Sequence, residues 1–157
     1  MTKPADIKAD IVPYSDEYAA QIRGWIESAE TYKHVCRGTD FPPPENIISS
    51  WQRDTVNSYI LIDSGKPIAY GELWHRKDEM AFELAHILVD PYKRSQGYGT
   101  KLIKLLYERA ATRDDVAKVI IKLFQENPEA LSCLMKAGFE ITGTTNYTTG
   151  IRLVKYA

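Results

Sequence analysis

The chain has 157 residues, of which 44% are hydrophobic and 26% are charged, and its formal net charge is −1. These values predict one folded domain over residues 1–157, large enough to bury its own core. The balanced charge argues against nucleic acid as a partner. No apolar run reaches membrane-spanning length and no apolar leader is present, so we expect a cytoplasmic protein without membrane partners. Cys36 and Cys133 have neither metal-ligand nor disulfide spacing, which predicts free thiols and no metal site.

The first half of the chain alternates between strand-like and helix-like patterns. Ser15 is a suitable N-cap for an amphipathic helix, whose apolar residues recur at helical spacing until residues 37–40 break it. Asp63-Ser64-Gly65-Lys66 is a hairpin turn between two β-branched and aromatic runs. The expected elements are a strand over residues 7–14, helices from residue 15 to the 37–40 break and over 45–53, and strands over 56–62 and 67–75.

The second half of the chain continues this alternation. Residues 116–124 are almost continuously apolar, which is typical of a central strand covered on both faces. Pro128 suits the first turn of a helix, and Gly138 ends that helix. The expected elements are a strand over 81–89, a helix beginning near Gly97, a strand over 116–124, a helix over 128–138, and closing hairpin strands over 139–145 and 151–156. Together they predict an α/β domain in which helices cover both faces of one mixed sheet.

Residues 88–100, Leu-Val-Asp-Pro-Tyr-Lys-Arg-Ser-Gln-Gly-Tyr-Gly-Thr, join the predicted 81–89 strand to the next helix. Gly97 and Gly99 lack a Cβ atom, so the backbone there can approach a ligand closely. The helix that follows directs unpaired N–H groups and the positive end of its dipole toward that ligand. This segment therefore predicts a binding site for a diphosphate.

Other phosphate-binding motifs fit this segment less well. A P-loop needs Gly-Lys-Ser/Thr after a four-residue gap, and the chain has no such sequence. A dinucleotide fingerprint needs a third glycine at the position of Leu102. A glycine-rich turn that binds no ligand is the remaining alternative.

Arg94-x-x-Gly97-x-Gly99 resembles the acetyl-CoA signature of the Gcn5-related N-acetyltransferase (GNAT) family, and Asn127-x-x-Ala130 with Gly138-Phe139 is similar to the family's second conserved block. The resemblance implies the acyl-CoA N-acyltransferase fold, a mostly antiparallel sheet of about seven strands flanked by four helices. It also implies transfer of an acetyl group from acetyl-CoA to a primary amine of a small molecule or peptide, without a metal. A CoA-binding module with little turnover and a protein N-terminal or lysine acetyltransferase are the alternatives. The family also forms dimers, so the expected state is a monomer or homodimer.

Backbone N–H groups around the glycines are the expected contacts of the CoA diphosphate, assisted by Arg94. The resemblance implies that the pantetheine arm runs beside residues 87–89 and pairs with their backbone. Asn127 matches the family asparagine that contacts the arm, and it is equally suited to capping the following helix. The predicted cofactor-binding residues are Ile87, Leu88, Val89, Arg94, Ser95, Gln96, Gly97, Tyr98, Gly99, Thr100 and Asn127.

Deprotonation of the acceptor calls for a general base, because an alkyl amine with pKa near 10.4 is neutral only about once in 2,500 at pH 7. Glu83 is the first candidate, since a glutamate acts as base at the matching place in histone-acetylating members of the family. Glu72 and His86 are the alternatives. Strand parity places Glu83 and His86 on opposite faces, unless a β-bulge of the kind common in this family's fourth strand reverses the alternation.

The general acid is unassigned, because Leu134 stands where many family members carry a tyrosine. The adjacent Cys133 is expected to point elsewhere, since a helix turns about 100° per residue. Tyr147 is a weaker substitute. Acidic and aromatic residues suited to a cationic acceptor, such as a polyamine, amino sugar or peptide amine, are Trp25, Glu27, Glu30, Tyr32, Asp40, Phe41, Trp51 and Trp74.

Overall fold

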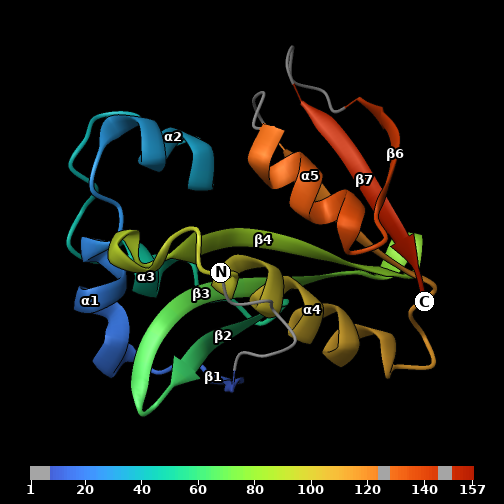
Figure 1. The fold of residues 1–157 in the computed structure, drawn as a ribbon, viewed down its shortest axis with the longest axis horizontal. Helices are drawn as coiled ribbons and strands as arrows, with labels where there is room; N and C mark the ends of the chain where they lie inside the picture. The colour runs from blue at the N-terminus through green and yellow to red at the C-terminus, as the bar shows by residue number, and fades with distance from the viewer. Residues whose placement is uncertain (1–7, 124–127, 145–149) are drawn as a thin grey trace.

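The computed structural model describes residues 8–123, 128–144 and 150–157 (Figure 1). Seven strands form one sheet in the order β1-β2-β3-β4-β5-β7-β6. Among these strands only β4 and β5 run parallel, so the predicted mixed, mostly antiparallel sheet of seven strands is confirmed. The strands are β1 Ala9–Pro13, β2 Val56–Asp63, β3 Lys66–Arg76, β4 Ala81–Val89, β5 Lys118–Leu123, β6 Glu140–Thr144 and β7 Ile151–Tyr156.

Helices cover both faces of this sheet. Helices α4 (Tyr98–Ala111) and α5 (Pro128–Lys136) share one face, where Leu102 and Leu106 of α4 are fully buried against the strands. The short N-terminal helices α1 (Ala19–Gly24), α2 (Ala29–Cys36) and α3 (Ile47–Ser50) lie on the other face, around a core that includes Tyr70 of β3. In Figure 1, α2 and α5 lie on either side of the space above β4. Three 3-10 turns complete the described elements: η2 Asp16–Tyr18, η3 Lys77–Glu79 and η4 Pro91–Lys93.

The N-terminal helix expected from Ser15 is divided in two, which gives five α-helices instead of four in the described chain. Ser28 has extended backbone, and its side chain accepts a hydrogen bond from the N–H of Thr31, so it caps a new helix, α2. Arg37 in the left-handed conformation ends α2. The second expected helix is also shorter than predicted, because α3 has four residues.

Strand β4 contains a β-bulge at its centre. Tyr70 of β3 pairs with Leu88 and Glu72 pairs with Ala85, so β4 carries one residue more than its partner over this interval. His86 lies within the extra segment and has a positive φ of 50°. The bulge reverses the alternation of side chains: Leu84 belongs to the core beneath α4, whereas Leu88 belongs to the core of the N-terminal helices. The simple alternation of side chains along β4 is therefore interrupted, and Glu83 and His86 face the same side of the sheet.

Strands β4 and β5 separate in the middle of the sheet. Their parallel pairing extends from Ala81↔Lys118 to Leu84↔Ile121, and both strands continue beyond it without pairing further. Beyond Leu84, the edge of β4 that faces β5 is consequently open. This opening positions the candidate site. Within the described residues, no helix is long and apolar enough to cross a membrane.

Candidate active site

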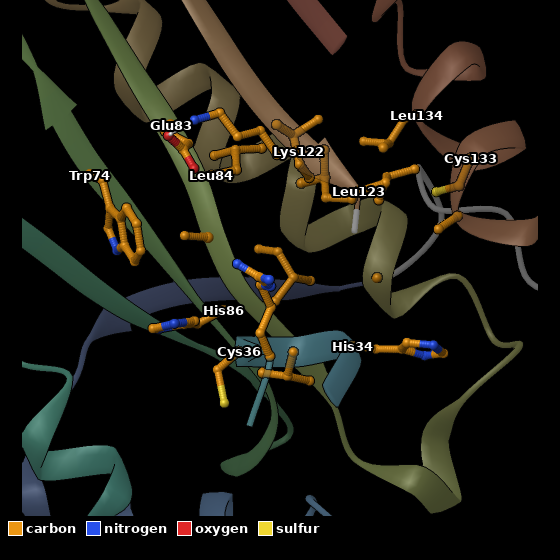
Figure 2. Close-up of a pocket in the computed structure, with 18 of the residues that line it drawn as sticks. His34, Cys36, Trp74, Glu83, Leu84, His86, Lys122, Leu123, Cys133 and Leu134 are labelled. Carbon is orange, nitrogen blue, oxygen red and sulfur yellow. Dashed lines mark ion pairs between the residues drawn. The ribbon is translucent and has the colours of Figure 1, made fainter. Parts of the chain in front are cut away.

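Two adjoining cavities occupy the opening between β4 and β5. The larger, of about 960 Å³, lies over the glycine loop, and the smaller, of about 560 Å³, extends along β4 and β5. In the close-up of the smaller cavity, His34 and Cys36 of α2 lie at the bottom of the view, and Cys133 and Leu134 of α5 lie at the upper right (Figure 2). The cavities share lining residues from α2, β4, α4 and α5, namely His34, Val35, Ile87, Gly99, Ala130 and Cys133. The two cavities therefore adjoin along these residues, between the loop and the inner strands.

The glycine loop presents its backbone N–H groups to the larger cavity. Gly97 has a φ of 89°, a conformation that favours glycine, and it precedes the first residue of α4, a helix of 14 residues. The first hydrogen bond of the helix runs from the N–H of Lys101 to the carbonyl of Gly97. No described residue accepts a hydrogen bond from the N–H groups of residues 95–100. These donors fit a diphosphate, because they converge at the positive end of a helix dipole.

The structure brings most of the predicted cofactor residues to this cavity. Arg94 lines it and lies 3.4 Å from Oε1 of Glu27, an ion pair in which both side chains are about half exposed. The side chain of Gln96 does not line it and donates to the carbonyl of Tyr92 instead. Asn127 lies outside the described residues. The predicted residues that line the larger cavity are Ile87, Leu88, Val89, Arg94, Ser95, Gly97, Tyr98, Gly99 and Thr100.

A fully buried carboxylate, Glu72, lies behind the smaller cavity. Its oxygens accept hydrogen bonds from the Tyr70 hydroxyl and from Nε1 of Trp74, the latter at 2.7 Å. Burial, and then the charge of Glu72, raises the pKa of Tyr70, so the hydroxyl remains a donor at neutral pH. Nδ1 of His86 is 2.9 Å from Oε1 of Glu72, but the angle is too poor for an aligned hydrogen bond. Glu72 therefore acts on the His86 ring mainly through its charge.

The imidazole of His86 is held between two tryptophans. It stacks on Trp51 with ring centroids 4.1 Å apart, and its centroid lies 5.2 Å from that of Trp74, whose ring is nearly perpendicular to it. The side chain is 13% exposed and lines the smaller cavity. No described residue makes a hydrogen bond to Nε2 of His86. The ring thus has one nitrogen against a buried carboxylate and the other available for a ligand.

Glu83 lies on the same side of β4 but is already paired with two cations. Its Oε1 is 2.9 Å from Nη2 of Arg76 and 3.4 Å from Nζ of Lys122. Figure 2 shows Lys122 reaching from β5 toward the Glu83 carboxylate. The Glu83 side chain is 6% exposed, whereas Arg76 and Lys122 are 38% and 32% exposed. The carboxylate therefore lies beneath the two cations.

A model of the acetyltransferase (GNAT) family matches residues 19–139. The chain belongs to this family. Aminoglycoside N(6')-acetyltransferase type 1 from Klebsiella pneumoniae and from Serratia marcescens are each 28% identical over 109 residues, covering 62% of this chain and 54% of theirs. The chain thus spans about half the length of these curated relatives.

Solved GNAT structures share the fold over nearly the whole chain. The aminoglycoside acetyltransferase AAC(6')-Ib in complex with coenzyme A has a TM-score of 0.77 at 20% identity and covers 95% of both chains. Spermidine N-acetyltransferase from Vibrio cholerae, in complex with CoA and spermine, has a TM-score of 0.78 at 14% identity, also with 95% of both chains covered. These likenesses confirm the predicted acyl-CoA N-acyltransferase fold.

Cys133 points in another direction than the adjacent Leu134. It lines both cavities and contacts Oγ1 of Thr100 on α4. Leu134, the residue at the tyrosine position of many GNAT members, is 1% exposed and packs in the core beneath α4. Because Leu134 faces the sheet, the helical turn directs Cys133 toward α4 and the junction of the cavities, and not away from it. Tyr147 lies outside the described residues.

The predicted acceptor residues are dispersed. Trp25, Tyr32 and Trp51 belong to the N-terminal core. Glu27 and Glu30 line the larger cavity, Trp74 lines the smaller one, and Asp40 and Phe41 line neither. Four basic residues of the smaller cavity were not predicted from the sequence: His34, Arg37, Arg76 and Lys122. Arg76 and Lys122 each stand two positions from the residue paired with Glu83, on the same strand face, a relation that only the strand register reveals.

Proposed function

We propose that this chain transfers the acetyl group of acetyl-CoA to a primary amine. The observation that carries the proposal is the loop at residues 95–100, whose N–H groups have no described partner and which lines a cavity adjoining the one that contains His86. Membership of the GNAT family and relatives named as N-acetyltransferases support it. Acetyl-CoA would supply a thioester whose carbonyl carbon is open to attack by an amine.

Two parts of the chain fit the binding of CoA. The N–H groups of residues 95–100 and the guanidinium of Arg94 suit the diphosphate, because charge-assisted hydrogen bonds are the strongest in proteins. The exposed pair of Arg94 with Glu27 is weak enough to exchange for a phosphate. The open edge of β4 after Leu84 offers backbone groups with which the amides of an extended arm can pair.

His86 is the residue we favour as general base. Its Nε2 has no described partner, its ring lines the cavity, and its Nδ1 lies against the Glu72 carboxylate. When Nε2 takes a proton from the acceptor ammonium, the buried negative charge attracts the imidazolium that forms. Glu72 is then a positioning residue, much as a carboxylate orients histidine in hydrolase triads. Glu83 remains the alternative base, less favoured because Arg76 and Lys122 already occupy its Oε1.

The leaving thiolate needs little assistance. A thiol with pKa near 8.5 is a tolerable leaving group as its anion, so the absence of a tyrosine at Leu134 does not preclude turnover. A binding module without turnover is the second candidate function, and the buried, non-acidic Leu134 is the observation that favours it.

Calorimetry with acetyl-CoA and thiol release over a panel of amines test the proposal together. We expect stoichiometric binding and release of CoA that depends on the acceptor. Binding without release for any free amine or peptide would support the binding module. Activity on peptides alone would indicate a protein acetyltransferase, and no detectable heat or thermal shift at millimolar acetyl-CoA would refute the whole proposal.

A further inference from the structure

The charges of the smaller cavity are predominantly positive. Among the described residues that line it, the side chains with a fixed charge are Arg37, Arg76, Lys122 and Glu83. Glu83 is the sole carboxylate of this set. Two imidazoles, those of His34 and His86, also line the cavity and add positive charge when protonated.

The arrangement of these charges matters as much as their number. Arg76 and Lys122 share one oxygen of Glu83, so a single negative charge is divided between two cations. The carboxylate is almost fully buried, while about a third of each basic side chain is exposed. A molecule in the cavity therefore meets the cations and not the carboxylate. A second anion, bound between Arg76 and Lys122, would balance the remaining positive charge of this pair.

Acidic residues lie at the other end of the combined space. Glu27 and Glu30 line only the larger cavity, beside the cofactor loop, and Glu27 pairs there with Arg94. Glu72 is fully buried and engaged by Tyr70 and Trp74. The described part of the smaller cavity thus offers no exposed carboxylate to a polyamine or amino sugar, contrary to the expectation from sequence.

We propose that the acceptor carries a carboxylate in addition to its amine, as an amino acid or an ω-amino acid does, and that Arg76 and Lys122 bind this carboxylate. This inference rests on the proposed acetyl transfer. The amine would lie near His86, toward the junction with the cofactor cavity, and the carboxylate would lie toward Lys122 on β5. The structural neighbours crystallised with kanamycin or spermine hold amines that are cationic at neutral pH. Such polycations would meet like charges in this cavity.

Acceptors of equal length separate the effect of charge from that of size. 5-Aminopentanoate, pentylamine and 1,5-diaminopentane differ at the far end by a negative, neutral or positive group. α-Amino acids and their amides extend the series. We expect kcat/KM for the best carboxylate acceptor to exceed that of its neutral and cationic counterparts by about tenfold or more.

Lys122→Gln should remove most of this preference. Lys118→Gln is the matched control, because Lys118 lies on the same strand, pairs with Glu79, and does not line the cavity. Cationic acceptors preferred by the wild-type protein, or a preference unchanged in Lys122→Gln, would overturn the inference.

Calorimetric binding of the same acceptors to protein saturated with CoA keeps the two proposals distinguishable. Preference for the carboxylate in binding, without any thiol release, would support carboxylate binding by Arg76 and Lys122 and refute acetyl transfer. Turnover that favours the diamine would refute the inference alone. Absence of binding and of turnover for every carboxylate tested would overturn the inference as well.

Discussion

Replacement of His86 by glutamine tests the proposed base most directly. At pH 7 an alkyl amine is neutral about once in 2,500 molecules, and a positioned base recovers about 10²–10⁴ of that deficit. Glutamine retains polarity and approximate size between Trp51 and Trp74 but cannot take the proton. We expect kcat/KM to fall about 10²–10³-fold at pH 7. The variant should then gain about tenfold per pH unit toward pH 10, because it depends on amine already neutral in solution.

The assay is thiol release at saturating acetyl-CoA from pH 6.5 to 10, with cofactor affinity measured separately. Glu83→Gln is the matched control, because it removes a charge on the same side of β4 and breaks the pairs with Arg76 and Lys122. That variant should alter acceptor KM while keeping the pH profile of the wild type. A loss in His86→Gln that is equal at every pH, or a pH-dependent loss confined to Glu83→Gln, would refute the role of His86.

Three further predictions concern the loop, the buried network and a thiol. Gly97→Val places a β-branched residue at a φ of 89°, so the Kd for acetyl-CoA should rise at least about tenfold by calorimetry, while Gly24→Ala, in open space, leaves it unchanged. Tyr70→Phe removes a donor to the buried Glu72, and urea unfolding should give a loss of about 1.5–3 kcal/mol. Because the pKa of Tyr70 is raised in the folded protein, the contribution of its hydroxyl to the free energy of unfolding is complete below about pH 10 and declines at higher pH. An equal alkaline decline of stability in Tyr70→Phe would contradict this assignment. Burial, and then the charge of Glu72, raises the pKa of Cys36, so maleimide labelling followed by mass spectrometry should be slow at pH 7 and faster at pH 9; rapid labelling at pH 7 would contradict it.

The strands and the glycine loop were predictable because local sequence determines them. The turn at 63–66 has positive φ at Ser64 and Gly65, as a tight hairpin requires. The continuous apolar run of β5 matches a strand whose side chains are buried on both faces. In the motif at residues 94–99, Gly97 has a φ of 89°, a backbone conformation that favours glycine.

Other features depend on contacts between distant segments. The bulge at His86 is visible only in the register of β4 against β3, and it decides which candidate bases share a face. Arg76 and Lys122 lie 46 positions apart in the sequence. Both reach Glu83 because β4, which carries it, lies between their strands β3 and β5 in the sheet. The helix break at Ser28 is different, because it depends on a local cap, which competes with the amphipathic pattern and which periodicity alone does not show.

The part of β4 beyond Leu84, which does not pair with β5, affects how readily the protein self-associates. A strand edge with unpaired N–H and C=O groups can form hydrogen bonds with a strand of a second copy of the chain. A bound pantetheine arm would cover those groups and, by mass action, stabilise the folded chain. Concentrated preparations without CoA are therefore expected to be the more prone to self-association on storage.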